Sequence, residues 1–330
     1  AVASTPAGDL ISSAITYNPV TESYDGRVYL IDGTSGAELL EIQNPSPSGS
    51  DHFGWSVAIS GTLVVIGAEG DDTSATNAGS AYVYDLSSAT PATPVATLRD
   101  PGPSGVNGFG ISVAIDKTSI VVGSPQDNTG AFNAGSAYAY DLASATPATP
   151  VATLRDPGPS ADDWFGNSVA ISDTWVVVGT PLGDTGALGA GSVCVYAVSG
   201  ATPTRPMILL NPSPAEGDTF GESVAVSGTW VIVGAPRDDT GGYDAGTVYV
   251  YNLASATRTW PVAMIHNPNP VAGYCQFGRS VAISGTRVVV GAPGDDDTDH
   301  VGNAYVYDLA SATPTTPVAT LLNPSPSSFD

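Results

Sequence analysis

The segment FGWSVAISGTLVVIGAEGDD (residues 53–72) recurs along the chain with small changes. It returns as FGISVAIDKTSIVVGSPQDN from Phe109 and as FGRSVAISGTRVVVGAPGDD from Phe277. Two further copies begin at Phe165 and Phe220, so the Phe-Gly pairs follow one another at intervals of 56, 56, 55 and 57 residues. A period of this length, made of short apolar segments, is typical of β-propellers and repeat arrays.

Each repeat contains four short segments with the composition of β-strands. In the first complete repeat they are Ser56–Ser60, Leu63–Gly67, Ser80–Leu86 and Pro94–Leu98. The second segment is apolar throughout, as expected for a strand that is covered on both faces. Only a short turn separates the first two segments, which predicts a tight hairpin. Because propeller blades pack against a neighbour on each face, the sequence predicts an all-β propeller of four-stranded blades.

Two prolines separated by one residue mark the end of each repeat. Proline cannot donate a ladder hydrogen bond and it stiffens the chain, so each marker predicts a linker between two blades. Together with the Phe-Gly pairs, the markers place the repeat starts at about residues 53, 109, 165, 220 and 277. The six markers begin at Asn44, Asp100, Asp156, Asn211, Asn267 and Asn323.

Residues 1–52 are interpreted as an incomplete first blade, because no Phe-Gly pair precedes them. Residues 26–45 match the third and fourth strands of the other repeats, and SAITYNP (Ser13–Pro19) fits a second strand. We therefore predict one domain over residues 1–330, with six blades and a ring closed by an irregular N-terminal strand. Seven blades are the alternative, and they require further strands in the first 25 residues or in chain outside this sequence.

Composition limits the class of protein and its partners. The chain is 42% hydrophobic and 12% charged, so it has enough apolar residues to fold, and its 38 Gly and 27 Pro suit many turns. With 32 acidic and 9 basic residues the net charge is −23, which disfavours nucleic acid and anionic lipid as partners. No apolar run approaches the roughly 18 residues that a membrane-spanning helix needs. The opening AVAST without Met fits a processed, secreted chain.

These motifs resemble the FG-GAP repeat, the blade unit of integrin α-subunit propellers and of many bacterial surface proteins. Gly-Ala-Pro is spelled in full at 234–236 and at 291–293, and it is varied in the other repeats. The resemblance implies a propeller in which each Phe fills the space between blades and the following Gly allows close backbone approach. The positions that carry this motif are Phe53, Gly54, Phe109, Gly110, Phe165, Gly166, Phe220, Gly221, Phe277 and Gly278.

Calcium is the one cofactor that the sequence raises. Integrin-type repeats often carry an Asp-x-Asp-x-Asp-Gly loop between strands one and two, but here that connection is too short to surround an ion with six to eight oxygens. The acidic residues lie instead between strands two and three, where Asp and Asn also build ordinary solvated turns. A weak calcium site in these loops is the alternative interpretation, with the candidate ligands Asp295, Asp297, Asp299, Asp238, Asp239 and Asp244.

Catalytic residues are not predicted. His52, His266 and His300 fall in different repeats, and Cys194 occupies a position that is Tyr in four other repeats, which indicates a core replacement. Cys194 and Cys275 belong to repeats two apart, so we predict that they do not form a disulfide. Trp55 and Trp164 flank Phe-Gly motifs, where they either stack on a sugar ring or simply pack against neighbouring residues.

The function predicted from the sequence is an extracellular binding or adhesion module, or a structural surface module, without catalytic activity. Loops on a rigid ring suit large ligands, and this prediction follows from the family resemblance because a fold alone does not fix function. We expect a protein or glycan partner on the cell surface or in the extracellular matrix, with no nucleic acid and no membrane insertion. The alternative is a lectin-like propeller or a glycan-active enzyme. No ligand-binding residue is assigned.

Overall fold

A computed structural model describes residues 2–5, 8–18, 23–103, 105–197, 205–270, 273–295 and 302–322. These residues contain strands and turns but no helix, and the strands form six antiparallel sheets of four strands each. The predicted fold class, an all-β propeller of six four-stranded blades, is therefore confirmed. Within the described ranges, no helix has the length and apolar composition needed to cross a bilayer. Contacts divide the chain into two compact units, which are described separately below.

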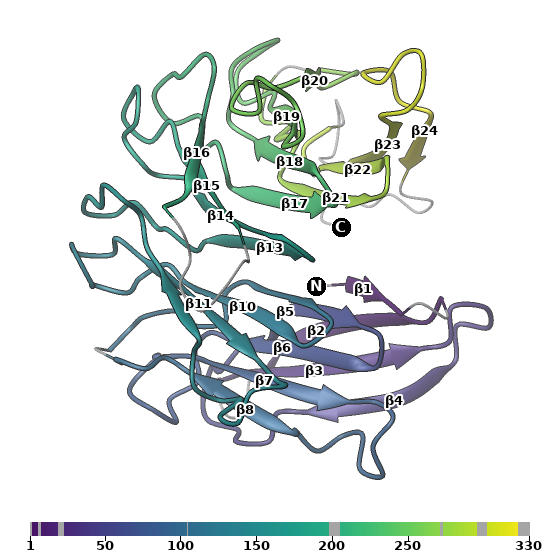
Figure 1. Cartoon of the computed structure of the whole chain (residues 1–330). Helices are drawn as coiled ribbons and strands as arrows, with labels where there is room; N and C mark the ends of the chain where they lie inside the picture. Colours follow the sequence, from purple (N-terminus) through teal and green to yellow (C-terminus); the bar gives the residue numbers. More distant parts are fainter. Residues whose placement is uncertain are drawn as a thin grey trace. The chain divides into compact units, whose positions relative to one another are not determined.

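The first unit comprises residues 1–171 and 199–203. It contains three sheets in which strands that follow one another in the chain are hydrogen-bonded neighbours (Figure 1). Their strands are β1 (Val2–Ser4), β2 (Leu10–Asn18), β3 (Ser23–Ile31), β4 (Glu38–Gln43), β5 (Phe53–Ser60), β6 (Leu63–Ala68), β7 (Ser80–Asp85), β8 (Ala96–Arg99), β9 (Val113–Asp116), β10 (Ser119–Ser124), β11 (Ser136–Asp141) and β12 (Ala152–Leu154).

The second unit comprises residues 172–198 and 204–330, and the division falls at the end of β13 (Ser168–Ser172). Its sheets follow the same neighbour order as those of the first unit. The remaining strands are β14 (Trp175–Thr180), β15 (Ser192–Ala197), β16 (Met207–Leu210), β17 (Ser223–Ser227), β18 (Trp230–Ala235), β19 (Thr247–Asn252), β20 (Ala263–His266), β21 (Ser280–Ser284), β22 (Arg287–Ala292), β23 (Asn303–Asp308) and β24 (Ala319–Leu322).

The strands of the first complete repeat lie where the sequence predicts them, and no end is shifted by more than three residues. β5 begins earlier, at Phe53, because Phe53 pairs with Ala68 beyond an irregularity in the ladder. β8 begins later than predicted, at Ala96, because Pro94 has no N–H with which to extend the ladder. Gly61 and Thr62 connect β5 to β6, and Gly61 adopts a φ of +62° that suits a tight turn.

The first 52 residues contribute a sheet of four strands, β1 to β4. β2 includes most of the segment predicted as a second strand, and β3 and β4 fall within residues 23–43. β1 has three residues, and its ladder runs only from the pair Val2–Ser12 to the pair Ser4–Leu10. β1 is the first strand of this sheet. Because no Phe-Gly pair precedes residues 1–52, the repeat pattern does not predict this strand.

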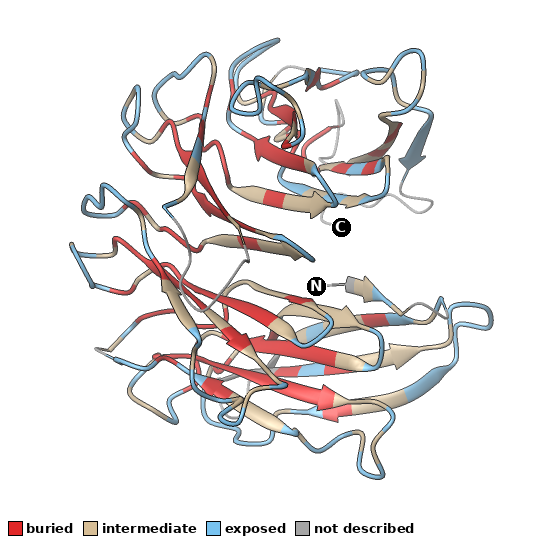
Figure 2. Cartoon of the chain, viewed as in Figure 1, coloured by how far each residue is buried: buried red, intermediate tan, exposed pale blue. Residues whose placement is uncertain are grey.

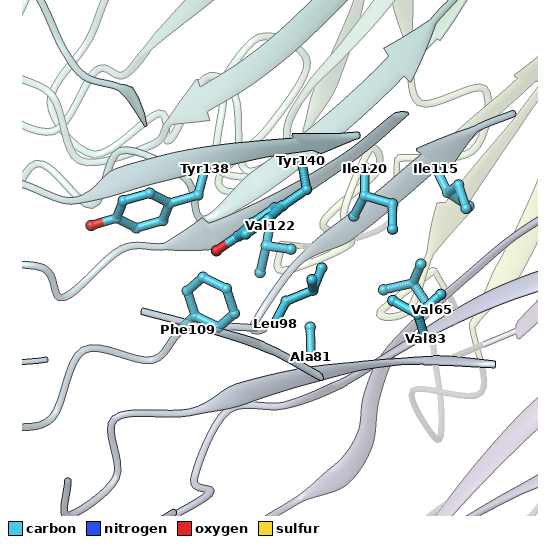
Figure 3. Packing of buried hydrophobic residues seen from close by; sticks show 10 residues of the cluster. All are labelled: Val65, Ala81, Val83, Leu98, Phe109, Ile115, Ile120, Val122, Tyr138 and Tyr140. Atoms are coloured by element: carbon cyan, nitrogen blue, oxygen red, sulfur yellow. The ribbon is translucent and has the colours of Figure 1, made fainter. Parts of the chain in front are cut away.

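The core lies between successive sheets, where apolar side chains of two sheets meet. Figure 2 shows the buried residues concentrated along the strands and the exposed residues in the loops. In one cluster, Phe109 is enclosed by residues of the sheet that precedes it and by residues of its own sheet (Figure 3). The former are Val65, Ala81, Val83 and Leu98, and the latter are Ile115, Ile120, Val122, Tyr138 and Tyr140.

The Phe-Gly pair joins neighbouring sheets through its backbone as well as its ring. Gly110 has a φ of +95°, and a Cβ at this position would lie 2.5 Å from the carbonyl oxygen of Ser80. The hydroxyl of Ser56 in the preceding sheet donates to the Gly110 carbonyl oxygen at 2.7 Å. Equivalent bonds join Ser112 to Gly166 and Ser223 to Gly278. Only glycine fits this position, because a side chain would be both sterically blocked and in a disfavoured conformation.

Candidate functional site

The loops between the second and third strands of the repeats, here called the acidic loops, share one turn geometry. They are residues 69–79, 125–135, 181–191 and 236–246. In three of them an aspartate near the start accepts a hydrogen bond from the backbone N–H two residues later, which is a turn that Asp favours. The donor–acceptor pairs are Thr73 with Asp71 (2.7 Å), Thr129 with Asp127 (2.7 Å) and Thr240 with Asp238 (2.8 Å).

A second side chain closes each acidic loop across five residues. In each case its oxygen accepts from the backbone N–H of a residue with a left-handed φ, so the loop has a fixed shape. The pairs are Asn77 with Asp72 (2.6 Å), Asn133 with Asn128 (2.8 Å), Gly189 with Asp184 (2.9 Å) and Asp244 with Asp239 (2.9 Å). The φ angles of the four donor residues lie between +46° and +61°, a region where Asn, Asp and Gly are the usual residues.

The tip of each of three acidic loops presents an apolar side chain to solvent. These side chains are Phe132, Leu188 and Tyr243, and each lies three residues before the Gly that directly precedes the third strand. Their exposed fractions are 64%, 64% and 61%. The carbonyl oxygen of each tip accepts from the backbone of the following linker. These donors are Asp162 (2.8 Å), Gly217 (2.9 Å) and Tyr274 (3.0 Å), respectively. The backbone that carries these exposed side chains is therefore held in place by hydrogen bonds to the linker.

Tyr243 also meets a second exposed aromatic ring. The ring centroids of Tyr243 and Tyr274 are 5.1 Å apart with an interplanar angle of 79°, an edge-to-face arrangement that aromatic pairs favour. Tyr274 is 56% exposed, so neither ring is explained by core packing. The backbone N–H of Gln276 donates to the Asp244 carbonyl oxygen at 3.0 Å, which holds the two segments together beneath the rings.

Beneath the acidic loops, buried aspartates pair with tyrosines of the third strand. The hydroxyls of Tyr138 and Tyr249 donate to Asp127 and Asp238 at 2.5 Å, and Tyr82 and Tyr305 make the same bond to Asp71 and Asp295. All four aspartates are buried. Burial raises the pKa of each of these tyrosines above its usual range, and the bond to the neighbouring carboxylate adds to the rise. The hydroxyls therefore remain protonated donors that stabilise the loop bases.

The carboxylates respond differently to burial according to their hydrogen bonds. Burial opposes ionisation of Asp127, but bonds from Tyr138 and Thr129 outweigh it and hold the pKa of Asp127 below its usual value. Asp218 receives fewer compensating bonds. Burial together with the charge of Asp238 raises the pKa of Asp218 to about 6, although the backbone N–H of Ala215 partly opposes this rise.

The third complete repeat lacks both members of the Tyr–Asp pair. Cys194 stands opposite Val178 in the β14–β15 ladder, the place that Tyr249 takes opposite Val233 in the β18–β19 ladder. Four residues after Gly179, where the other complete repeats have the buried aspartate, the sequence has Gly183. Loss of the donor together with the acceptor avoids leaving either group buried without its partner. Cys194 and Cys275 form no disulfide, as predicted, and both are buried.

The predicted calcium ligands serve other contacts where the structure describes them. Asp238 and Asp239 accept the turn hydrogen bonds described above, and Asp244 lies at the left-handed end of the same loop. Asp295 accepts from Tyr305 and from the side-chain amides of Asn267 (3.0 Å) and Asn303 (3.3 Å). Asp297 and Asp299 lie outside the described residues. Over the described ranges, no three His, Cys, Asp or Glu side chains are arranged to hold a metal ion. Calcium binding stays a prediction.

The described histidines lie in separate polar contacts. His52 Nδ1 is 2.7 Å from Glu69 Oε1, and His266 Nδ1 is 3.2 Å from Thr247 Oγ1, whereas His300 falls outside the described residues. Trp55 is exposed and its ring lies 5.6 Å from that of His52. Trp164 is half-buried, and its indole N–H has no hydrogen-bond partner among the described residues. These contacts assign no reaction to the histidines.

The phenylalanines of the Phe-Gly pairs are buried, whereas the loop tips are exposed to solvent. The rings of Phe53, Phe109, Phe165, Phe220 and Phe277 are all fully buried, and their glycines have φ angles of +90° to +95°. The exposed tips were missed by the sequence analysis, which considered only the acidic residues of these loops. Aligning the repeats on the residues Ala-Gly that end each loop would have revealed the apolar position two residues earlier.

Comparison with protein families gives one match. The family model described as FG-GAP repeat matches residues 45–84, 93–140, 149–196, 208–251 and 268–307. The five matches together cover roughly two thirds of the chain, and each includes a Phe-Gly pair with the second and third strands that follow it. A comparison with curated proteins gave no match.

Proposed function

Because the chain belongs to the FG-GAP repeat family, we propose that it is an extracellular binding or adhesion module without catalytic activity. The observation that carries the proposal is the set of apolar loop tips, Phe132, Leu188 and Tyr243. Large exposed apolar side chains at one repeated position gain nothing from the core, whereas they suit contact with a partner. The closed turns beneath them reduce the ordering that binding would require.

The preferred partner is a protein or glycan of the cell surface or extracellular matrix. Tyrosine is common at binding hot spots because it combines a large apolar ring with a polar hydroxyl. The net charge of −23 favours ligands with neutral or basic surfaces over nucleic acid or anionic lipid. Membership of the FG-GAP family supports an extracellular location. A lectin-like or glycan-active protein is the competing proposal, and the test below separates the two by the ligands that bind.

The test is an array of extracellular-matrix proteins and glycans probed with the full chain, with and without calcium. The tip variant carries Phe132→Ser, Leu188→Ser and Tyr243→Ser. The matched control carries Val95→Ser, Val151→Ser and Val262→Ser, which change apolar side chains about half exposed before the fourth strands. We expect wild type and control to bind the same matrix ligand and the tip variant to lose it. Absence of any array ligand, or equal binding by the tip variant, would contradict the proposal.

A further inference from the structure

A small polar cavity of about 220 Å³ lies in the second unit, apart from the loop tips. Its lining comes from the segment before β17, from the start of the loop after β18 and from the segment before β21. The lining residues are Thr219, Glu222, Pro236, Arg237, Gln276 and Arg279. This lining is almost entirely polar, which suits a charged or hydrogen-bonding ligand rather than an apolar one.

Two of the few basic residues of this acidic chain line the cavity. The whole chain contains nine Lys and Arg residues against 32 Asp and Glu, yet two arginines line this one cavity. Arg279 Nη1 donates to Glu222 Oε1 at 2.5 Å, so one guanidinium is balanced by a carboxylate inside the cavity. Arg237 is near enough to Asp244 to act on its ionisation, but Asp244 does not line the cavity. The lining itself therefore carries one net positive charge.

Thr219 supplies a second and independent indication of a ligand. It is 3% exposed, and its Oγ1 has no hydrogen-bond partner among the described residues although the residue lines the cavity. Leaving a buried hydroxyl without a partner costs free energy unless a ligand or water supplies one. Thr219 also has a φ of +55°, but the residue directly before Phe-Gly has a left-handed φ in every complete repeat. This angle therefore belongs to the blade motif, and the unpartnered hydroxyl alone is the indication of a ligand.

Comparison between repeats shows that the two arginines are not part of the blade motif. The position of Arg237, directly after the residue that ends Gly-Ala-Pro, is Gly70, Gln126 or Leu182 in the preceding repeats. The position of Arg279, directly after Phe-Gly, is Trp55, Ile111, Asn167 or Glu222. The other repeats therefore have neutral residues at the first place and neutral or acidic residues at the second. Arg279 forms an ion pair with Glu222 of the preceding repeat, whereas no hydrogen bond or ion pair of Arg237 is seen among the described residues.

We propose that this cavity binds a small oxyanion, such as the carboxylate or sulfate group of an acidic ligand. Arginine guanidinium presents several N–H donors in a plane, which matches the oxygen geometry of such groups. Gln276 and Thr219 line the same cavity and carry neutral hydrogen-bonding groups. The single net positive charge suits a monoanion. The site is distinct from the loop tips, so it stands or fails independently of the proposed binding function.

The test is titration of the full chain with sodium acetate, glucuronate, sulfate and phosphate, followed by calorimetry and thermal unfolding. Sodium chloride at equal ionic strength is the reference for every anion. Because a protein of net charge −23 repels anions in general, saturable binding of one equivalent would report a local site. We expect such binding, together with a rise in melting temperature that follows anion concentration. The acetate and glucuronate arms separate carboxylate recognition from recognition of sulfate or phosphate.

Three variants locate the site, and one provides the control. Arg237→Gln and Arg279→Gln should each weaken the affinity about tenfold, as expected for loss of a charge-assisted bond, and Thr219→Val should weaken it less. Arg258→Gln makes the same charge change at an exposed position in the β19–β20 turn, so it should bind as wild type does. The arginines of the cavity are exposed, so these variants should fold. Lack of saturable binding by wild type, or equal binding by all four variants, would overturn the proposal.

Discussion

Phe109 illustrates what one ring of the repeated motif contributes to stability. It is fully buried, its centroid lies 5.8 Å from that of Tyr138, and it contacts side chains of two sheets. Phe109→Ala should lower the free energy of unfolding by about 3–5 kcal/mol, because it removes the ring and leaves a cavity. Phe132→Ala, at an exposed tip, should change it by less than about 0.5 kcal/mol. Urea unfolding measures both, and equal effects of the two variants would show that the Phe-Gly ring is not a core element.

The Tyr249–Asp238 bond should show energetic coupling. Tyr249→Phe and Asp238→Ala each leave one buried group without its partner and should each cost about 1–3 kcal/mol. The double variant should cost less than the sum of the two, with a coupling of at least about 0.5 kcal/mol. Tyr307→Phe is the control, because it removes a buried hydroxyl that has no partner among the described residues and should be nearly neutral. Additive losses in the double variant would mean that the bond contributes nothing specific.

Asp218 predicts an unusual dependence of stability on pH. Its pKa in the folded chain is raised to about 6, mainly by burial, whereas an unfolded aspartate titrates at about 3.9. Between these values the folded state binds the extra proton, so stability should rise as pH falls from 7 to about 4 and should be lost as pH rises through about 6. Asp218→Asn should flatten this part of the profile. Parallel unfolding profiles for wild type and variant between pH 4.5 and 7.5 would refute the assignment.

The strands are the elements that sequence reasoning predicts best. The apolar run Leu63–Gly67 and the short connection before it determine a buried hairpin with little competition from other structures. β1 and β2 were harder to predict because the N-terminal sheet has no Phe-Gly pair and β1 forms a ladder of three residues. In physical terms, a short strand is determined by the sheet edge that it joins rather than by its own composition.

The candidate sites depend on contacts that no local pattern reveals. The sequence shows the acidic residues of the loops, but the pairing of Asp238 with Tyr249 places that carboxylate in the protein interior rather than at a ligand. The tip position of Tyr243 becomes significant only when its exposure and its contact with Tyr274 are known. Likewise, Arg237 and Arg279 are 42 positions apart in the sequence and line one cavity only because neighbouring sheets bring them together.

Calcium binding by the loops between the second and third strands remains a prediction. A true site requires several oxygens at about 2.3–2.6 Å from the ion, and the segment that begins at Asp295 has the highest density of carboxylates. We expect weak stoichiometric binding that calorimetry detects and that Asp297→Ala abolishes. Asp72→Ala, in the acidic loop of the first complete repeat, is the matched control and should not alter it. If calcium raises the melting temperature no more than sodium chloride of equal ionic strength, the loops are only acidic turns.

For the molecule as a whole, charge and exposed apolar groups have separate roles. The net charge of −23 opposes self-association through exposed tips such as Phe132, because copies of one acidic chain repel each other. The acidic surface also disfavours anionic partners everywhere except where arginine is concentrated. The two proposals, a neutral or basic macromolecule at the tips and a small oxyanion at the cavity, are therefore compatible with each other.

The most direct test of the binding module is to measure which side chains its ligand covers. Hydroxyl-radical labelling of the full chain, alone and saturated with the ligand that the array identifies, reports the exposure of each apolar side chain. The account predicts that Phe132, Leu188 and Tyr243 become protected while Val151 and Val262, which are also exposed, are labelled as before. Protection confined to the valines, or unchanged labelling at all three tips in the saturated complex, would contradict it.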